Sequence, residues 1–91
     1  MTDFATGYVP DLEDRFLRYV RIDTQSDAMS PGVPSTRKQF DLLNLLQQEL
    51  RELGASQVRV TENGFTIATI PATVERATPR LAFLAHVDTT A

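Results

Sequence analysis

The chain has 91 residues, a formal net charge of −3 and no cysteine. This length allows one small domain with a modest core. The nine basic residues are scattered, so no face suits nucleic acid or an anionic membrane surface, and the missing cysteines exclude disulfides and thiolate metal sites. No apolar run approaches the ~20 residues of a membrane span, and no signal-peptide pattern opens the chain. We therefore expect a cytoplasmic protein.

The amino-terminal third predicts a leader, a helix and a long loop. Residues 1–10 are mostly small and polar, so we expect a flexible leader ahead of a domain at 11–91. From Leu12 to Ile22 the apolar residues recur at helical spacing, and Asp11 is a suitable N-cap. Residues 23–35 contain turn residues without apolar periodicity. A loop of this length is often functional, although a mobile surface connection explains it equally well.

The second predicted helix covers Arg37 to Leu53 and is the clearest element in the sequence. Thr36 and Gln39 have the spacing of a capping box, and Gly54 follows where a glycine commonly ends a helix. Its leucines fall on one broad face, which predicts core packing. The stripe consists of Leu42, Leu43, Leu45, Leu46, Leu50 and Leu53, with Phe40 at its start.

Three strands are expected after this helix. Val58 and Val60 alternate with polar residues, and Phe65 to Ile70 forms a second short run that ends at Pro71. Asn63-Gly64 between them is a strong hairpin signal, because both residues tolerate positive φ. Leu81 to Val87 is nearly all apolar, as in a strand buried on both faces. The expected fold is α/β, with two helices packed on a small sheet made of a hairpin and a central-type strand.

The candidate site lies at the end of that third strand. His86 is the only histidine, and Asp88 follows two positions later, so on a strand both side chains point to one face. An imidazole nitrogen can bind a metal while the carboxylate orients the ring. His-x-Asp is common by chance, however, and a surface or hydrogen-bonded structural histidine is the alternative.

Few other residues in the sequence offer metal ligands. A catalytic zinc needs at least three protein ligands. Asp23 and Asp27 lie in the long loop and could approach the site, although their spacing does not require it. The remaining acids fall at helix N-termini or on an expected solvated face, which includes Asp41, Glu49 and Glu52.

Several stretches resemble the amino-terminal part of aminopeptidases of the M20 metallopeptidase family. They include Asp-Thr-Gln-Ser at 23–26, Val-Pro-Ser-Thr at 33–36, the leucine-rich helix, Asn-Gly-Phe-Thr-Ile-Ala-Thr-Ile-Pro-Ala from 63, and Ala-His-Val-Asp-Thr from 85. The resemblance covers about residues 11–90. It implies a zinc-dependent enzyme that releases the amino-terminal residue of tripeptides, with a two-zinc catalytic domain and a smaller domain that usually supports dimerisation.

The resemblance also implies residue roles, with His86 as a zinc ligand and Asp88 as a catalytic aspartate. The bridging aspartate, the general-base glutamate and the other ligands of the family lie outside these 91 residues. We therefore expect an amino-terminal segment that cannot hold two zinc ions and is inactive alone. The alternative is a non-catalytic α/β module that associates through an exposed strand edge, as a homo-oligomer or with another chain.

Overall fold

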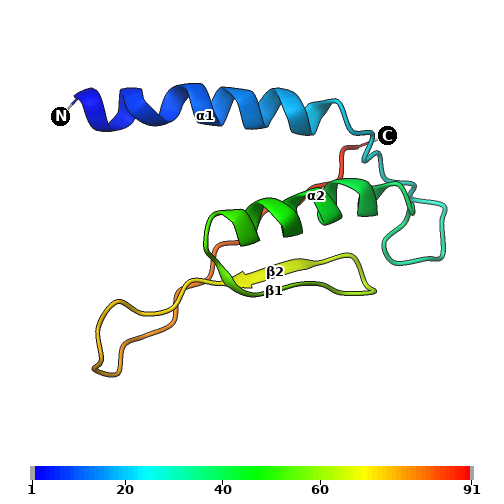
Figure 1. Cartoon of the computed structure of the whole chain (residues 1–91). Coiled ribbons are helices and arrows are strands. Elements are labelled where there is room, and N and C mark those ends of the chain that lie inside the picture. The colour runs from blue at the N-terminus through cyan, green and yellow to red at the C-terminus, as the bar shows by residue number, and fades with distance from the viewer. Residues whose placement is uncertain (1, 91) are drawn as a thin grey trace.

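The computed structural model describes residues 2–90, with side chains from residue 7 onward. Its elements are helix α1 (Thr2–Val20), helix α2 (Gln39–Glu52), strand β1 (Ser56–Val60) and strand β2 (Thr66–Thr69). Helix α2 lies between α1 and the antiparallel hairpin, which confirms the α/β arrangement of two helices and a small sheet (Figure 1). No helix in this described part combines the length and hydrophobicity needed to cross a membrane.

Helix α1 begins about ten residues earlier than expected. It starts at Thr2, so residues 2–10 are helical and the expected helix start at Leu12 is wrong, while residue 1 lies outside the described residues. Asp11, the expected N-cap, lies inside the helix, as does Pro10. Tyr8 precedes Leu12 by four residues and extends the apolar stripe toward the amino terminus.

Helix α2 lies within two residues of its expected bounds, and its end is the one that the sequence predicts. Gly54 has φ +92°, its amide donates to the Arg51 carbonyl at 3.0 Å, and the Ala55 amide donates to the Leu50 carbonyl at 3.0 Å. This is a Schellman motif. At the other end the Gln39 side chain donates to the Thr36 hydroxyl at 3.0 Å, but the N-cap is Lys38 and it has no side-chain capping hydrogen bond, so the predicted capping box of Thr36 and Gln39 does not form.

The core lies between α2 and the hairpin. Leu42 and Leu43 are its buried apolar residues, whereas Leu53 at the end of the stripe is exposed. Along β1 and β2, alternate residues are half-buried, and the Thr66 hydroxyl donates to the Leu43 carbonyl at 2.9 Å. The leucine stripe is therefore core in its first half only.

The hairpin is confirmed, with a turn that places one residue in the left-handed region. The Thr61 amide donates to the Phe65 carbonyl at 2.7 Å, and the Gly64 amide donates to the Thr61 carbonyl at 3.1 Å. Gly64 has φ +88°, whereas Asn63 is not among the described residues with positive φ. A turn followed by a left-handed glycine is the usual three-residue hairpin loop. Within β1, Gln57 at φ 52° accompanies a shift in register.

The expected third strand does not form. Residues 81–87 run alongside α2 without strand pairing, and the exposed fractions of Leu81, Phe83 and Leu84 are 82%, 91% and 95% (Figure 1). A groove of about 1580 Å³ lies between this segment and β2. A strand is stabilised by hydrogen bonds to neighbours, and the described residues place no strand beside this one. The prediction that the apolar residues at 81–87 form a strand buried on both faces is therefore wrong for this chain.

Candidate functional site

His86 and Asp88 contact one another, although no strand carries them. The imidazole Nδ1 lies 3.2 Å from Asp88 Oδ1 and 3.0 Å from the Asp88 carbonyl oxygen. The His86 side chain is 85% exposed, whereas that of Asp88 is 39% exposed. One side of the imidazole is thus held by the aspartate, and the remainder of the ring faces solvent.

The partners of Nδ1 define which ring nitrogen carries the proton. A carbonyl oxygen and an ionised carboxylate oxygen can only accept hydrogen bonds, so Nδ1 must donate to satisfy either contact of His86 with Asp88. In the neutral ring this leaves Nε2 with a free lone pair. An exposed imidazole with a carboxylate behind it is the arrangement in which histidine commonly binds a metal.

The backbone beside Asp88 is attached to the long loop. The Thr89 amide donates to the Thr24 carbonyl at 3.2 Å, and the Ser26 amide donates to the Thr89 carbonyl at 2.8 Å, around an isolated parallel bridge between Gln25 and Thr89. Thr24 is buried at this junction. The loop at 23–36 therefore positions the His86–Asp88 pair, which is a structural role for a segment whose function the sequence left open.

The described residues supply one metal ligand and not a complete site. Among the side chains of residues 7–90, no group of three or more His, Asp or Glu is arranged to hold a metal ion. Asp23 instead pairs with Lys38 Nζ at 2.9 Å, and this hydrogen bond, with one from the Gln25 amide, lowers the pKa of Asp23. Asp27 accepts the Met29 amide at 3.0 Å. Of the ligands that a zinc ion needs, the described residues supply His86, with Asp88 as the carboxylate that orients its ring.

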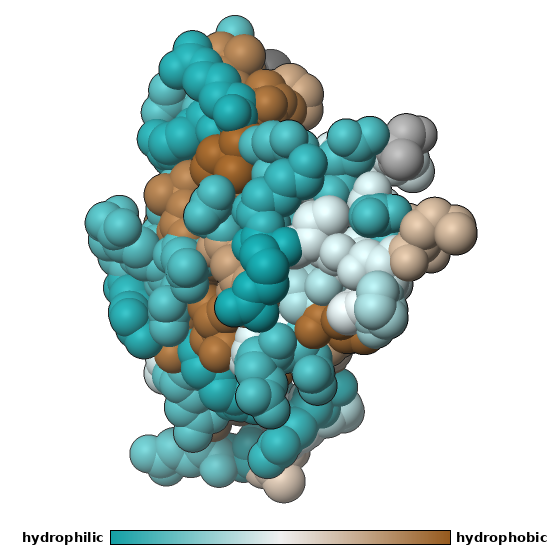
Figure 2. All heavy atoms as spheres, turned by 90° about the vertical axis from the view of Figure 1, so that its right-hand side faces the viewer, coloured by the Kyte–Doolittle hydropathy of each residue, from teal (hydrophilic) through white to brown (hydrophobic). Residues whose placement is uncertain are grey.

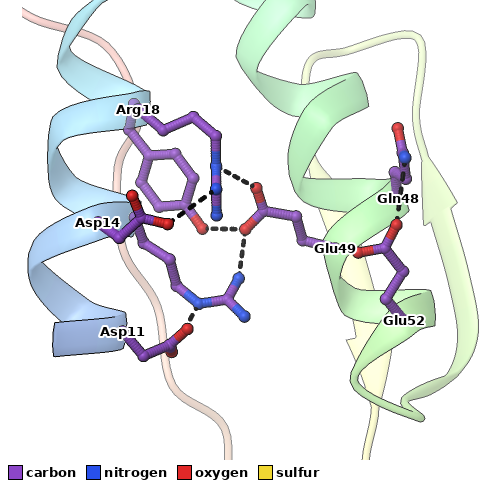
Figure 3. Close-up of polar contacts among 8 residues, drawn as sticks. Asp11, Asp14, Arg18, Gln48, Glu49 and Glu52 are labelled. Atoms are coloured by element: carbon purple, nitrogen blue, oxygen red, sulfur yellow. Dashed lines mark hydrogen bonds and ion pairs between the residues drawn. The ribbon is translucent and has the colours of Figure 1, made fainter.

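The structure reveals a polar cluster that the sequence did not predict. Glu49 was expected on a solvated face, but its side chain is only 8% exposed and faces α1. It accepts hydrogen bonds from Arg15, from Arg18 Nε at 3.0 Å and from the Tyr19 hydroxyl at 2.5 Å (Figure 3). Arg15 and Arg18 also pair with Asp11 and Asp14, one turn earlier. We call Glu49 with its three donors the Glu49 cluster.

Helical spacing contains a signal for this cluster. Glu49 follows Leu42 by seven residues and Leu46 by three, which places it on an inward-facing part of α2. Burial by itself would raise the pKa of Glu49, but hydrogen bonds from Tyr19 and Arg18 and the positive charges of both arginines hold that pKa below its usual value. Burial and the Glu49 contact raise the pKa of Tyr19. Glu49 therefore stays ionised and ties α1 to α2.

An apolar cavity of about 410 Å³ lies beside His86. Both helices line it, with Phe16 and Val20 from α1 and Leu42 and Leu46 from α2, and Val87 adds to it from the carboxyl-terminal segment. Figure 2 shows a band of hydrophobic surface that descends from the top of the molecule between hydrophilic regions. Leu12, Phe16 and Val20 of α1 are largely exposed, which leaves the Glu49 cluster as the main attachment of this helix among the described residues.

Comparison with known proteins identifies relatives of this chain. No protein family model matches it. It is 48% identical over 79 residues to peptidase T of Geobacillus thermodenitrificans, a match that covers 87% of this chain and 19% of that protein. It is 53% identical over 79 residues to peptidase T of Staphylococcus carnosus and 49% identical over 79 residues to peptidase T of Aliivibrio fischeri, with the same two coverages.

The chain spans about one fifth of the length of these relatives. Identity near one half over more than four fifths of the chain is shared by all three comparisons. The motifs therefore belong to a chain that is similar to a segment of peptidase T, as these comparisons show.

Proposed function

We propose that this chain is the amino-terminal segment of a cytoplasmic, zinc-dependent aminopeptidase that releases the amino-terminal residue of tripeptides. In the whole enzyme His86 is a zinc ligand, and Asp88 is the aspartate that holds its imidazole. The 91-residue chain by itself does not cleave peptides, because it contributes one ligand where a catalytic zinc needs at least three.

The observation that supports this proposal best is the contact between His86 and Asp88. Asp88 accepts the Nδ1 proton at 3.2 Å and leaves Nε2 free on an exposed ring. The chain is about 50% identical over 79 residues to relatives named peptidase T. Neither observation alone defines a reaction, but together they connect a metal-binding geometry to peptide hydrolysis.

Each residue has a definable part in that chemistry. His86 would hold a metal ion through Nε2, and the Asp88 carboxylate would fix the ring orientation and increase the basicity of that nitrogen. A bound zinc ion polarises the scissile carbonyl and lowers the pKa of a water molecule. The general base and the other ligands would come from the four fifths of the enzyme that this chain does not match.

A chimera tests the proposal. We would replace the matched 79 residues of the Geobacillus thermodenitrificans protein with those of this chain and measure tripeptide hydrolysis. We expect activity in the chimera and none in the 91-residue chain. Asp88→Asn should lower turnover about 10–100-fold, because an amide cannot accept with the charge of a carboxylate, and His86→Ala should lower it further. Asp41→Asn, the same change at an exposed position of α2, is the control.

Two outcomes would contradict the proposal. A folded but inactive chimera, beside an active parent protein, would show that this segment does not serve the peptidase reaction. Near-normal turnover of the Asp88→Asn chimera at saturating zinc would show that Asp88 has no role in orienting the ligand.

A further inference from the structure

Thr89, the residue that follows Asp88, is held by three hydrogen bonds from the long loop. Its amide donates to the Thr24 carbonyl at 3.2 Å, and its carbonyl accepts the Ser26 amide at 2.8 Å and the Ser26 hydroxyl at 3.1 Å. Two of these bonds join backbone groups, whereas the third requires the side chain of Ser26. Ser26 thus supplies a backbone donor and a side-chain donor to one carbonyl.

The peptide between Asp88 and Thr89 transmits this restraint to the candidate site. In a planar trans peptide, the carbonyl of one residue and the N–H of the next point in opposite directions. The Thr24 carbonyl fixes the direction of the Thr89 N–H, and so also that of the Asp88 carbonyl oxygen. This oxygen lies 3.0 Å from Nδ1 of His86, and Oδ1 of the same aspartate lies 3.2 Å from that nitrogen. The loop therefore restrains the residue that provides both acceptors of the imidazole proton.

A second hydroxyl attaches this part of the loop to α2. Thr36 Oγ1 donates to the Gln25 carbonyl at 2.9 Å, and Gln39 Nε2 donates to Thr36 Oγ1 at 3.0 Å. A carbonyl can only accept, so the single hydroxyl proton of Thr36 goes to Gln25, and the Thr36 oxygen accepts from the Gln39 amide. We call Gln39, Thr36 and Ser26 the loop clamp.

Gln39 is the anchor of the loop clamp. It is the first residue of α2 and is only 7% exposed, and a buried amide is costly unless its hydrogen bonds are made. Besides Thr36, its Nε2 reaches the Ser35 hydroxyl at 3.4 Å, and that hydroxyl accepts the Asp27 amide at 2.9 Å. The bonds of Gln39 therefore lead to the neighbours of Ser26 on both sides.

We propose that the loop clamp is a set of positioning residues for the candidate metal site. It holds the peptide that joins Asp88 to Thr89, and thereby keeps the Nδ1 proton of His86 on its two acceptors and leaves Nε2 free for a metal ion. The effect on the ring is a property of this chain and is measured without a metal. Only its consequence for turnover rests on the proposed peptidase function.

The tautomer of His86 tests the loop clamp, and its signals are unambiguous because this is the only histidine in the chain. NMR of the labelled imidazole nitrogens at alkaline pH, where imidazole is neutral, gives the ratio of the Nδ1–H form to the Nε2–H form. The Nδ1–H form should predominate in the original chain. Thr36→Val and Ser26→Ala each remove a hydroxyl hydrogen bond and should lower the ratio about fivefold, the equivalent of one net hydrogen bond. Thr36→Ser and Ser26→Thr keep a hydroxyl and should restore the ratio.

Thr66→Val is the matched control. The Thr66 hydroxyl also donates to a backbone carbonyl, that of Leu43 at 2.9 Å, but it does so in the hairpin. This variant should lose stability as Thr36→Val does, without a change in the tautomer ratio. Hydrogen exchange of the Thr89 amide should accelerate in the loop-clamp variants and not in the control, and circular dichroism checks that each variant is folded.

The chimera described above provides the second measurement. Thr36→Val and Ser26→Ala should lower its kcat at saturating zinc with little change in KM, because the loop clamp orients a ligand and does not bind the substrate. Thr66→Val should leave both constants near those of the original chimera.

Three results would overturn the inference: an original chain in which the Nε2–H form predominates, loop-clamp variants with an unchanged ratio, or a ratio that falls as far in Thr66→Val as in those variants. An inactive chimera would instead contradict the peptidase function, and the tautomer ratio would still decide on the loop clamp.

Discussion

Replacing Glu49 with alanine should detach α1 from the remainder of the protein. Glu49 accepts hydrogen bonds from Arg15, Arg18 and Tyr19, and all three donors come from α1. Few apolar contacts replace this attachment, since Phe16 and Val20 are both largely exposed. Removing the carboxylate takes away the acceptor that these three donors share, although Arg15 and Arg18 keep their pairs with Asp11 and Asp14.

The structure allows the size of the effect to be estimated. Removing one partner from a buried ion pair costs about 3–5 kcal/mol, because the remaining charge is left without compensation. The Glu49 side chain is 8% exposed, which supports the use of this range, but Arg15 and Arg18 keep their pairs with Asp11 and Asp14, and the Arg18 side chain is 42% exposed and can regain water. We therefore expect the lower end, about 3 kcal/mol of lost stability for Glu49→Ala. Glu49→Gln should lose about half as much, since its amide oxygen still accepts a neutral hydrogen bond worth about 1 kcal/mol.

Urea unfolding followed by circular dichroism measures this loss, and hydrogen exchange locates it. Exchange should accelerate in the amides of α1 and remain slow in α2 near Leu42 and Leu43. Glu52→Ala is the matched control, because Glu52 lies one turn further along α2, is exposed and, among the described residues, accepts a side-chain hydrogen bond from Gln48 alone, at 3.2 Å. A Glu49→Ala protein within about 0.5 kcal/mol of the original, the range of an ordinary surface substitution, would refute the role given to the Glu49 cluster.

Three further predictions follow from the geometry. The folded-state pKa of Glu49 lies below its ordinary 4.5, so the stabilisation by its carboxylate is complete above about pH 4.5 and is lost as pH falls through the folded pKa. Hydrogen exchange of the α1 amides, measured at decreasing pH, should show this loss. The Glu49→Gln protein should not show this pH dependence. Gly54→Ala should cost about 1–2 kcal/mol for its positive φ alone, whereas Gly64→Ala should cost more in urea unfolding, since its Cβ would also lie 3.1 Å from Pro34; equal costs would contradict this. Zinc titration calorimetry of the chain should show only weak binding, and a tight stoichiometric site lost in His86→Ala would contradict the single-ligand description.

Elements defined by local chemistry were predictable from the sequence. Gly54 ends α2 because a left-handed residue is needed there, and Gly64 closes the hairpin for the same reason. Both signals lie within a few residues of the structure that they produce. The start of α1 was missed because Asp11 has the residue type of an N-cap, and here the helix continues through it.

Features that depend on distant partners were not predictable in the same way. Glu49 has the residue type of a solvated face, and only the donors of Arg15 and Arg18, more than 30 residues away, explain its burial. Leu81 to Val87 has the composition of a buried strand, but composition does not supply the neighbouring strand. The candidate site falls between these two cases. The spacing of His86 and Asp88 predicted that the two side chains lie close together, while their roles in catalysis remain predictions.

The position of the His86–Asp88 pair depends on a loop and not on a sheet. In the carboxyl-terminal segment the one sheet-like contact is the bridge from Thr89 to Gln25, among the described residues. The Thr36 hydroxyl donates to the Gln25 carbonyl at 2.9 Å, and so joins this loop to the start of α2. The long loop thus takes the place of a neighbouring strand, because its backbone forms hydrogen bonds with Thr89, the residue that follows Asp88. Changes in this loop should therefore displace the candidate site, whereas changes in the hairpin should leave it in place.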